Sequence, residues 1–149
     1  MAVSLVIAVY YYDGYFYVPT CVRALDGRVG ITAPITTVAA DDRAALAEAI
    51  ELHAVAGNAT LSNADFRNAS DSALLAAMHL PNRQSFYTKT QRWSIVEDGG
   101  VYTLIPFKAA ALRGVVEDSA HAVTLNPATF ASEATQQIKA QLLTNLSGQ

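Results

Sequence analysis

The segment Val3–Val22, VSLVIAVYYYDGYFYVPTCV, predicts a β-hairpin that turns at Asp13-Gly14. Asp-Gly between two apolar runs favours a two-residue type I′ turn, because both central residues of that turn need positive φ. Such a turn pairs Tyr12 with Tyr15, and the next pairs follow outward in register. This hairpin is the clearest structural signal in the chain.

The two faces of the hairpin differ chemically, because successive side chains point to opposite sides of a strand. One face is strongly apolar and is expected on the core, with Leu5, Ile7, Val9, Tyr11, Phe16, Val18 and Val22. The other face carries four tyrosines, Tyr10, Tyr12, Tyr15 and Tyr17. These rings either pair with one another or lie beneath a helix, or they form an exposed patch for a protein partner, since tyrosine is enriched at interface hot spots.

The composition is that of one globular domain spanning residues 1–149. Apolar residues make up 52% of the chain and charged residues 15%, with a formal net charge of −3. Nucleic-acid binding usually needs a concentrated basic face, so nucleic acid is not the expected partner. A few basic residues interleave with aromatic ones in the second half, too few to change this: Lys89, Arg92, Lys108 and Arg113.

Two features bear on the compartment. Cys21 is the one cysteine, so no intramolecular disulfide is possible, which fits a reducing environment. The apolar N-terminal run lacks a basic segment before it and is too short to span a bilayer. We therefore expect a cytoplasmic protein with no membrane partner.

Beyond the hairpin, the first half predicts a strand and two helices. Residues 29–38 predict a third strand, and Pro34 within it indicates a sheet edge or a bulge. Residues 41–56 predict a helix capped by one of its first two residues. A polar loop is expected over residues 58–71, then a short helix over 72–80 that the following proline ends.

The second half predicts a return to strands. Segments 86–89, 92–97 and 101–108 have strand composition, and the turn Asp-Gly-Gly between the last two predicts a second hairpin. Segments 113–117 and 122–125 predict a last strand pair.

A C-terminal helix follows Asn126-Pro127, with proline suited to a first turn. Its apolar stripe is Phe130, Ala134, Ile138 and Leu142. The predicted fold is therefore α+β, a mostly antiparallel sheet of N-terminal and C-terminal hairpins covered by two main helices.

The sequence contains no recognised catalytic or metal-binding motif. His53, His79 and His121 are far apart and match no metal-ligand spacing, and no nucleophile elbow or phosphate loop occurs. We therefore predict no metal and no cofactor. The best acid–base group is His121 with Glu117 or Asp118, which makes a small hydrolase-like enzyme one alternative.

Paired acids contribute to a negative surface. Adjacent carboxylates alternate in direction along a strand, so Glu97-Asp98 and Glu117-Asp118 are poor acid–base dyads but suit contacts with a basic protein. Together with the tyrosine face they give the predicted partner-binding residues, Tyr10, Tyr12, Tyr15, Tyr17, Glu97, Asp98, Glu117 and Asp118.

Several strand segments carry a family resemblance. Residues 3–10 and 14–19, then 93–102 and 114–118, resemble small bacterial immunity proteins of contact-dependent growth inhibition. The resemblance implies a protein that binds the toxic domain of a cognate effector, often a nuclease, and blocks it inside the cell. A second alternative is a small-molecule-binding or structural oligomer subunit, in which the tyrosine face lines a cavity or a contact between copies.

Overall fold

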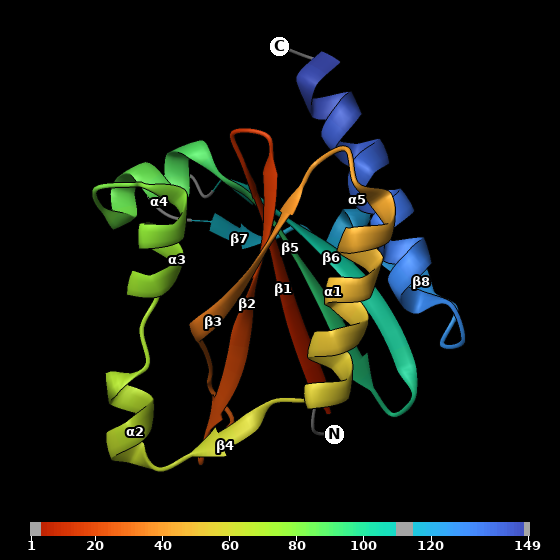
Figure 1. The fold of residues 1–149 in the computed structure, drawn as a ribbon. Coiled ribbons are helices and arrows are strands. Elements are labelled where there is room, and N and C mark those ends of the chain that lie inside the picture. The colour runs from red at the N-terminus through yellow and green to blue at the C-terminus, as the bar shows by residue number, and fades with distance from the viewer. Residues whose placement is uncertain (1–3, 110–114, 148–149) are drawn as a thin grey trace.

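The computed structural model of the chain describes residues 4–109 and 115–147 (Figure 1). Eight strands in these ranges form a sheet with the order β3-β2-β1-β5-β6-β7, while β4 pairs with β2 and β8 with β6. The strands are β1 (Leu5–Tyr12), β2 (Tyr15–Ala24), β3 (Val29–Ala39), β4 (Ala59–Leu61), β5 (Gln91–Asp98), β6 (Val101–Ala109), β7 (Val115–Glu117) and β8 (Val123–Leu125). All pairings are antiparallel except that of β2 with β4.

The helices lie on both sides of this sheet (Figure 1). They are α1 (Arg43–Ala56), α2 (Asn63–Asn68), α3 (Ser72–Met78), α4 (Arg83–Lys89) and α5 (Phe130–Ser147), with a 3₁₀ turn η1 (Ser119–His121). The predicted α+β class is confirmed, with α1 and α5 as the two main helices.

The N-terminal hairpin has the predicted register. Tyr10 pairs with Tyr17 and Tyr12 with Tyr15, and the turn residues Asp13 and Gly14 both have positive φ. On its other side β1 pairs with β5 along nearly its whole length, which places β1 in the middle of the sheet. The hairpin is therefore the element to which the C-terminal half of the sheet attaches.

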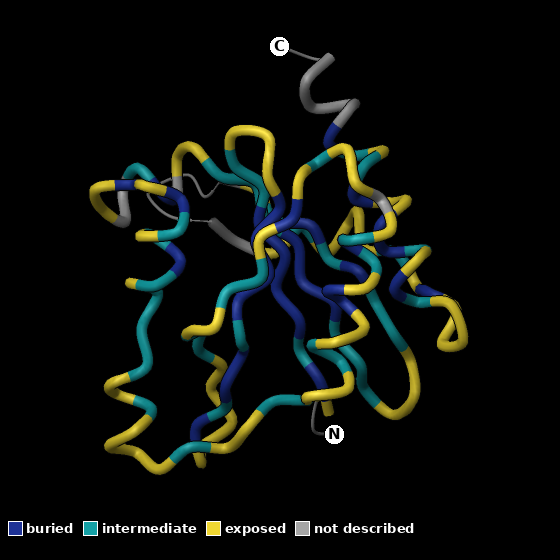
Figure 2. The backbone as a smooth tube through the Cα atoms, viewed as in Figure 1, coloured by how far each residue is buried: buried dark blue, intermediate teal, exposed yellow. Residues whose placement is uncertain are grey.

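The main core lies between the sheet and the helices α1 and α5. Asp42 begins α1 by accepting a hydrogen bond from the Ala45 amide at 3.1 Å, and Gly57 ends it with φ 70°. The predicted apolar stripe of α5 faces this core, as do Leu46, Ala49 and Ile50 of α1. Dark blue segments mark the core in Figure 2. Its largest fully buried members are Trp93, Phe16, Ile7, Leu46, Ile50, Ile95, Leu104 and Ile138.

A second, smaller core lies on the opposite face, beneath α3 and α4. Tyr10 and Tyr17 are 2% and 5% exposed there, and the Tyr10 ring lies 5.2 Å from that of Phe86 in α4. Leu74 and Met78 of α3 complete it. Burial under a helix is thus the correct interpretation for the inner half of the tyrosine face.

The side chain of Asn58 bridges β1 and β2 where their ladder has ended. Its Oδ1 accepts from the Val6 amide at 2.7 Å, and its Nδ2 donates to the carbonyls of Val6 and Cys21 at 2.9 and 3.3 Å. β4 then runs parallel to the end of β2. Asn58 thus replaces the missing ladder bonds at this fork.

Two predictions for the central third are wrong. Residues 58–71 form β4 and α2 rather than a loop, with Ser62 capping α2 through the Asp65 amide. Residues 86–89 belong to the helix α4, because Asn82 accepts a hydrogen bond from the Ser85 amide and starts a helical turn. Both errors concern short elements that are fixed by their capping residues.

The predicted last strand pair is also wrong in its pairing. β7 and β8 do not pair with each other; both pair with β6, β7 at residues 107–109 and β8 at residues 102–104. The turn η1 carries the chain from one position to the next. This arrangement places Asp118 and His121 beside α5.

Candidate functional site

The eight predicted partner-binding residues do not form one surface. Tyr10 and Tyr17 are buried, and Glu97 and Asp98 lie at the β5–β6 turn, at the end of the sheet opposite the β1–β2 turn. Glu117 and Asp118 lie beside the outer edge of β6, level with Phe107 and Pro106. The remaining two, Tyr12 and Tyr15, flank the β1–β2 turn.

Glu97 stabilises the β5–β6 turn that it shares with Asp98. The Glu97 Oε2 atom accepts a hydrogen bond from the Gly100 amide at 2.8 Å. Asp98 is half-buried, and its Oδ1 atom has no hydrogen-bond partner within the described ranges. A carboxylate that holds a turn is less available to a partner, so the structure gives Glu97 a local structural role.

The acidic rim is an exposed surface at the upper end of the sheet, defined by Asp13, Tyr15, Asp41 and Asp42. The β1–β2 turn and the β3–α1 loop lie side by side there, because Tyr15 pairs with Ala39 and the Ala40 amide donates to the Gly14 carbonyl at 3.0 Å (Figure 1). All four rim residues are exposed. The antiparallel meander therefore joins acids that are far apart in the sequence.

Tyr15 is the aromatic residue that the rim presents. Its exposed fraction is 48%, and no other aromatic ranks among the exposed large apolar residues of the described chain. Tyr12 is half-buried against the smaller core. Burial raises the pKa of Tyr17, with further contributions from Tyr15, Asp13 and Tyr12, which shows how closely these groups cluster.

The rim carries three exposed carboxylates. Neither Asp13 nor Asp41 forms an ion pair with any described residue. The nearby cation Lys139 donates from Nζ to the Ala40 carbonyl at 2.7 Å. Asp42 uses one oxygen as the helix cap of α1, so Asp13 and Asp41 are the freer acids.

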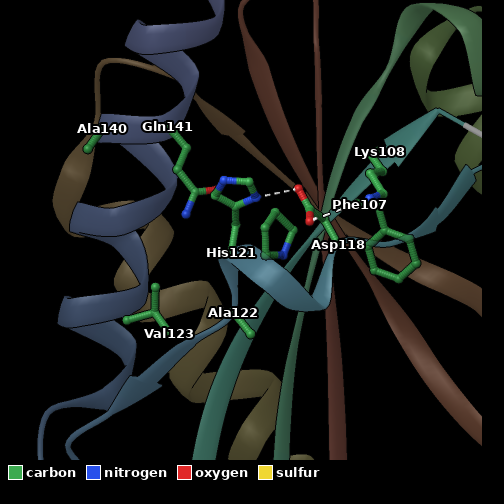
Figure 3. Close-up of a pocket in the computed structure, with 9 residues that line it drawn as sticks. Phe107, Lys108, Asp118, His121, Ala122, Val123, Ala140 and Gln141 are labelled. Carbon is green, nitrogen blue, oxygen red and sulfur yellow. Dashed lines mark hydrogen bonds and ion pairs between the residues drawn. The ribbon is translucent and has the colours of Figure 1, made fainter.

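A separate cavity of about 770 Å³ lies between η1, β6 and α5 (Figure 3). The His121 Nδ1 atom lies 2.7 Å from Asp118 Oδ2, and Lys108 Nζ lies 3.8 Å from Asp118 Oδ1. Gln141 accepts a hydrogen bond from the Trp93 indole at 2.8 Å, which anchors its side chain at the wall. The described lining is Pro106, Phe107, Lys108, Asp118, His121, Ala122, Val123, Ala140 and Gln141.

Among the described residues, this cavity is lined by an acid–base pair but by no hydroxyl or thiol nucleophile. Asp118 orients His121 as an aspartate orients a catalytic histidine, but the pair spans a single 3₁₀ turn and the His121 side chain is 74% exposed. The described lining has no hydroxyl or thiol. Glu117, the other predicted acid, is exposed and does not line the cavity.

The remaining titratable candidates have structural positions. Cys21 is buried, and this burial raises the pKa of its thiol. His53 is half-buried between α1 and β3, where its Nε2 atom lies 3.1 Å from Thr36 Oγ1, and burial lowers its pKa. Arg113, part of the basic group in the second half, lies outside the described residues.

Comparison with known proteins identifies the fold. No protein-family model and no curated protein matches the chain. Among solved structures, that of a Neisseria meningitidis protein of unknown function is similar, with a TM-score of 0.68 over 89% of this chain and 90% of that chain, at 15% identity. None of the described helices has the length and apolarity to cross a membrane. The chain therefore shares its α+β architecture with the neisserial protein.

Proposed function

We propose that this chain is an immunity protein that binds the toxic domain of a cognate effector, such as a nuclease, and blocks it by protein–protein contact. The observation that supports this most is the acidic rim, where exposed Tyr15 lies among three exposed carboxylates. Interface hot spots favour tyrosine, and nearby charges of one sign accelerate association with an oppositely charged partner.

A nuclease is a suitable target for such a surface. Enzymes that bind nucleic acid neutralise phosphates with lysine and arginine, so their substrate-binding faces are basic. The rim acids Asp13 and Asp41 would pair with those side chains, and Tyr15 would occupy a pocket between them. Occupation of that face excludes the nucleic acid.

Co-expression with the C-terminal domain of the protein encoded by the open reading frame directly upstream, as the candidate toxin domain, tests this function. We expect the chain to restore growth and to co-purify with the toxin domain as a stable complex. A toxin domain that still stops growth in the presence of the chain, with no complex formed, would contradict immunity.

The cavity beside His121 favours a second candidate function, that of a small hydrolase-like enzyme. In such an enzyme, His121 is oriented by Asp118 and acts as a general base on a bound water, with Lys108 beside the developing charge.

Hydrolysis of nitrophenyl esters and phosphodiesters tests this role. His121→Gln should then lower the rate by about 10²–10⁴-fold, as expected for loss of general-base catalysis. His79→Gln, at the exposed end of α3, serves as the control. Equal rates for the wild type and His121→Gln would remove this candidate.

A further inference from the structure

Arg92 of β5 is held between two aromatic rings on the α3/α4 face of the sheet. Its guanidinium carbon lies 5.3 Å from the ring centre of Tyr10 and 4.3 Å from that of Phe107. Tyr10 of β1 is the cross-strand partner of Arg92, so the contact between this ring and the guanidinium follows from the sheet register. A cation placed over ring faces in this way is attracted to both and keeps one orientation.

Within the described residues, the same guanidinium lacks an anionic partner. Its Nε atom is buried and has no hydrogen-bond acceptor, and no described carboxylate forms an ion pair with it. Glu117 is two strands away, opposite Phe107, and is exposed. Buried polar atoms in folded proteins nearly always have a partner, so this donor is unusual. Arg92 as a whole is only half-buried, so part of its side chain is exposed.

We propose that Arg92 receives a carboxylate from an acidic side chain of the bound partner protein. The planar fork of arginine matches a carboxylate through two parallel hydrogen bonds. The two rings fix the guanidinium beforehand, which lowers the ordering cost of binding. This proposal rests on the proposed function. It adds a second contact with the same partner, apart from the acidic rim.

The surrounding charges favour a protein carboxylate over a nucleic-acid phosphate. Asp13 lies three residues beyond Tyr10 in the sequence, and Glu117 lies on the far side of Phe107. A polyanion would meet both acids as it approached Arg92. A protein surface can instead present one carboxylate to Arg92 and basic side chains to the acids around it.

Titration of the free protein with acetate tests the chemistry of the site. At constant ionic strength, NMR should show a saturable shift of the Arg92 Nε–H signal and of the Tyr10 and Trp93 amides with acetate, and none with chloride. Arg92→Lys retains the charge but lacks the fork, so the amide shifts should vanish in it. The wild-type Nε–H signal decides the matter by itself if the variant does not fold.

Three outcomes would overturn this inference. One is a wild type that responds to chloride as it does to acetate, and another is equal amide shifts in Arg92→Lys. The third is a stronger response to inorganic phosphate than to acetate, which would assign a phosphate ligand instead.

In the complex with the toxin domain, Arg92→Lys should weaken affinity by about tenfold, in line with loss of a charge-assisted hydrogen bond. Growth rescue without an acetate response would uphold immunity and reject the Arg92 site, whereas the reverse result would reject immunity alone.

Discussion

Asn58 connects β1 and β2 through the hydrogen bonds of its side chain. A single amide side chain satisfies both backbone groups of Val6 and the carbonyl of Cys21. Asn58 also begins an Asn-Ala-Thr glycosylation pattern, but its Nδ2 atom already donates two hydrogen bonds inside the fold. Attachment of a sugar there is incompatible with this fork.

We expect Asn58→Ala to lower the free energy of unfolding by about 2 kcal/mol, because it leaves part-buried backbone groups of β1 without partners. Urea denaturation followed by circular dichroism measures the change. Asn68→Ala is the matched control, since Asn68 is exposed at the end of α2 and should shift stability by less than about 0.5 kcal/mol. Equal effects of the two substitutions would contradict the bridging role.

At the scale of elements, α1 couples stability to pH through His53. Burial lowers the pKa of His53 below its ordinary value of 6.5, so the unfolded chain binds a proton more readily than the folded one. The contribution of neutral His53 to the free energy of unfolding is therefore complete above pH 6.5. It is lost as the pH falls from 6.5 to the lowered pKa. His53→Gln should flatten this part of the stability profile. Urea midpoints at several pH values between 5 and 8 measure it, and a profile identical to the wild type would exclude His53 as the cause.

How far the sequence predicts the elements depends on how local their determinants are. The Asp13-Gly14 turn fixes the first hairpin, and caps fix α1, so both were predictable. Pro34 correctly indicated an edge, because β3 is the first strand of the sheet order. Three-residue strands such as β7 carry no periodicity, so their attachment to β6 could not be read from their own residues.

The candidate site was predictable in part for the same reason. The tyrosine face is a property of the hairpin, but the point at which α3 and α4 stop covering it depends on tertiary packing. Tyr10 and Tyr17 are buried while Tyr15 is exposed for that reason alone. The proximity of Asp13 to Asp41 follows from the pairing of β2 with β3, which are consecutive in the sequence. The orphaned Arg92 depends on the β1–β5 pairing, which the sequence does not indicate.

At the scale of the whole molecule, helices on both faces of the sheet leave its ends and edges for contact (Figure 2). The acidic rim occupies one such end. The exposed Leu25 lies at the other end, in the β2–β3 turn, with an exposed fraction of 69%. Substitutions in the acidic rim can therefore test partner binding, and a substitution of Leu25 at the opposite end can serve as the control.

The affinity of purified variants for the proposed toxin domain tests whether the acidic rim is the neutralising surface. We expect Tyr15→Ala to weaken binding by at least about tenfold, as for an interface hot spot. The double variant of Asp13→Asn and Asp41→Asn should slow association and reduce its salt dependence. Leu25→Ala should bind as the wild type does. Wild-type affinity in the Tyr15 and aspartate variants would contradict the rim as the neutralising surface.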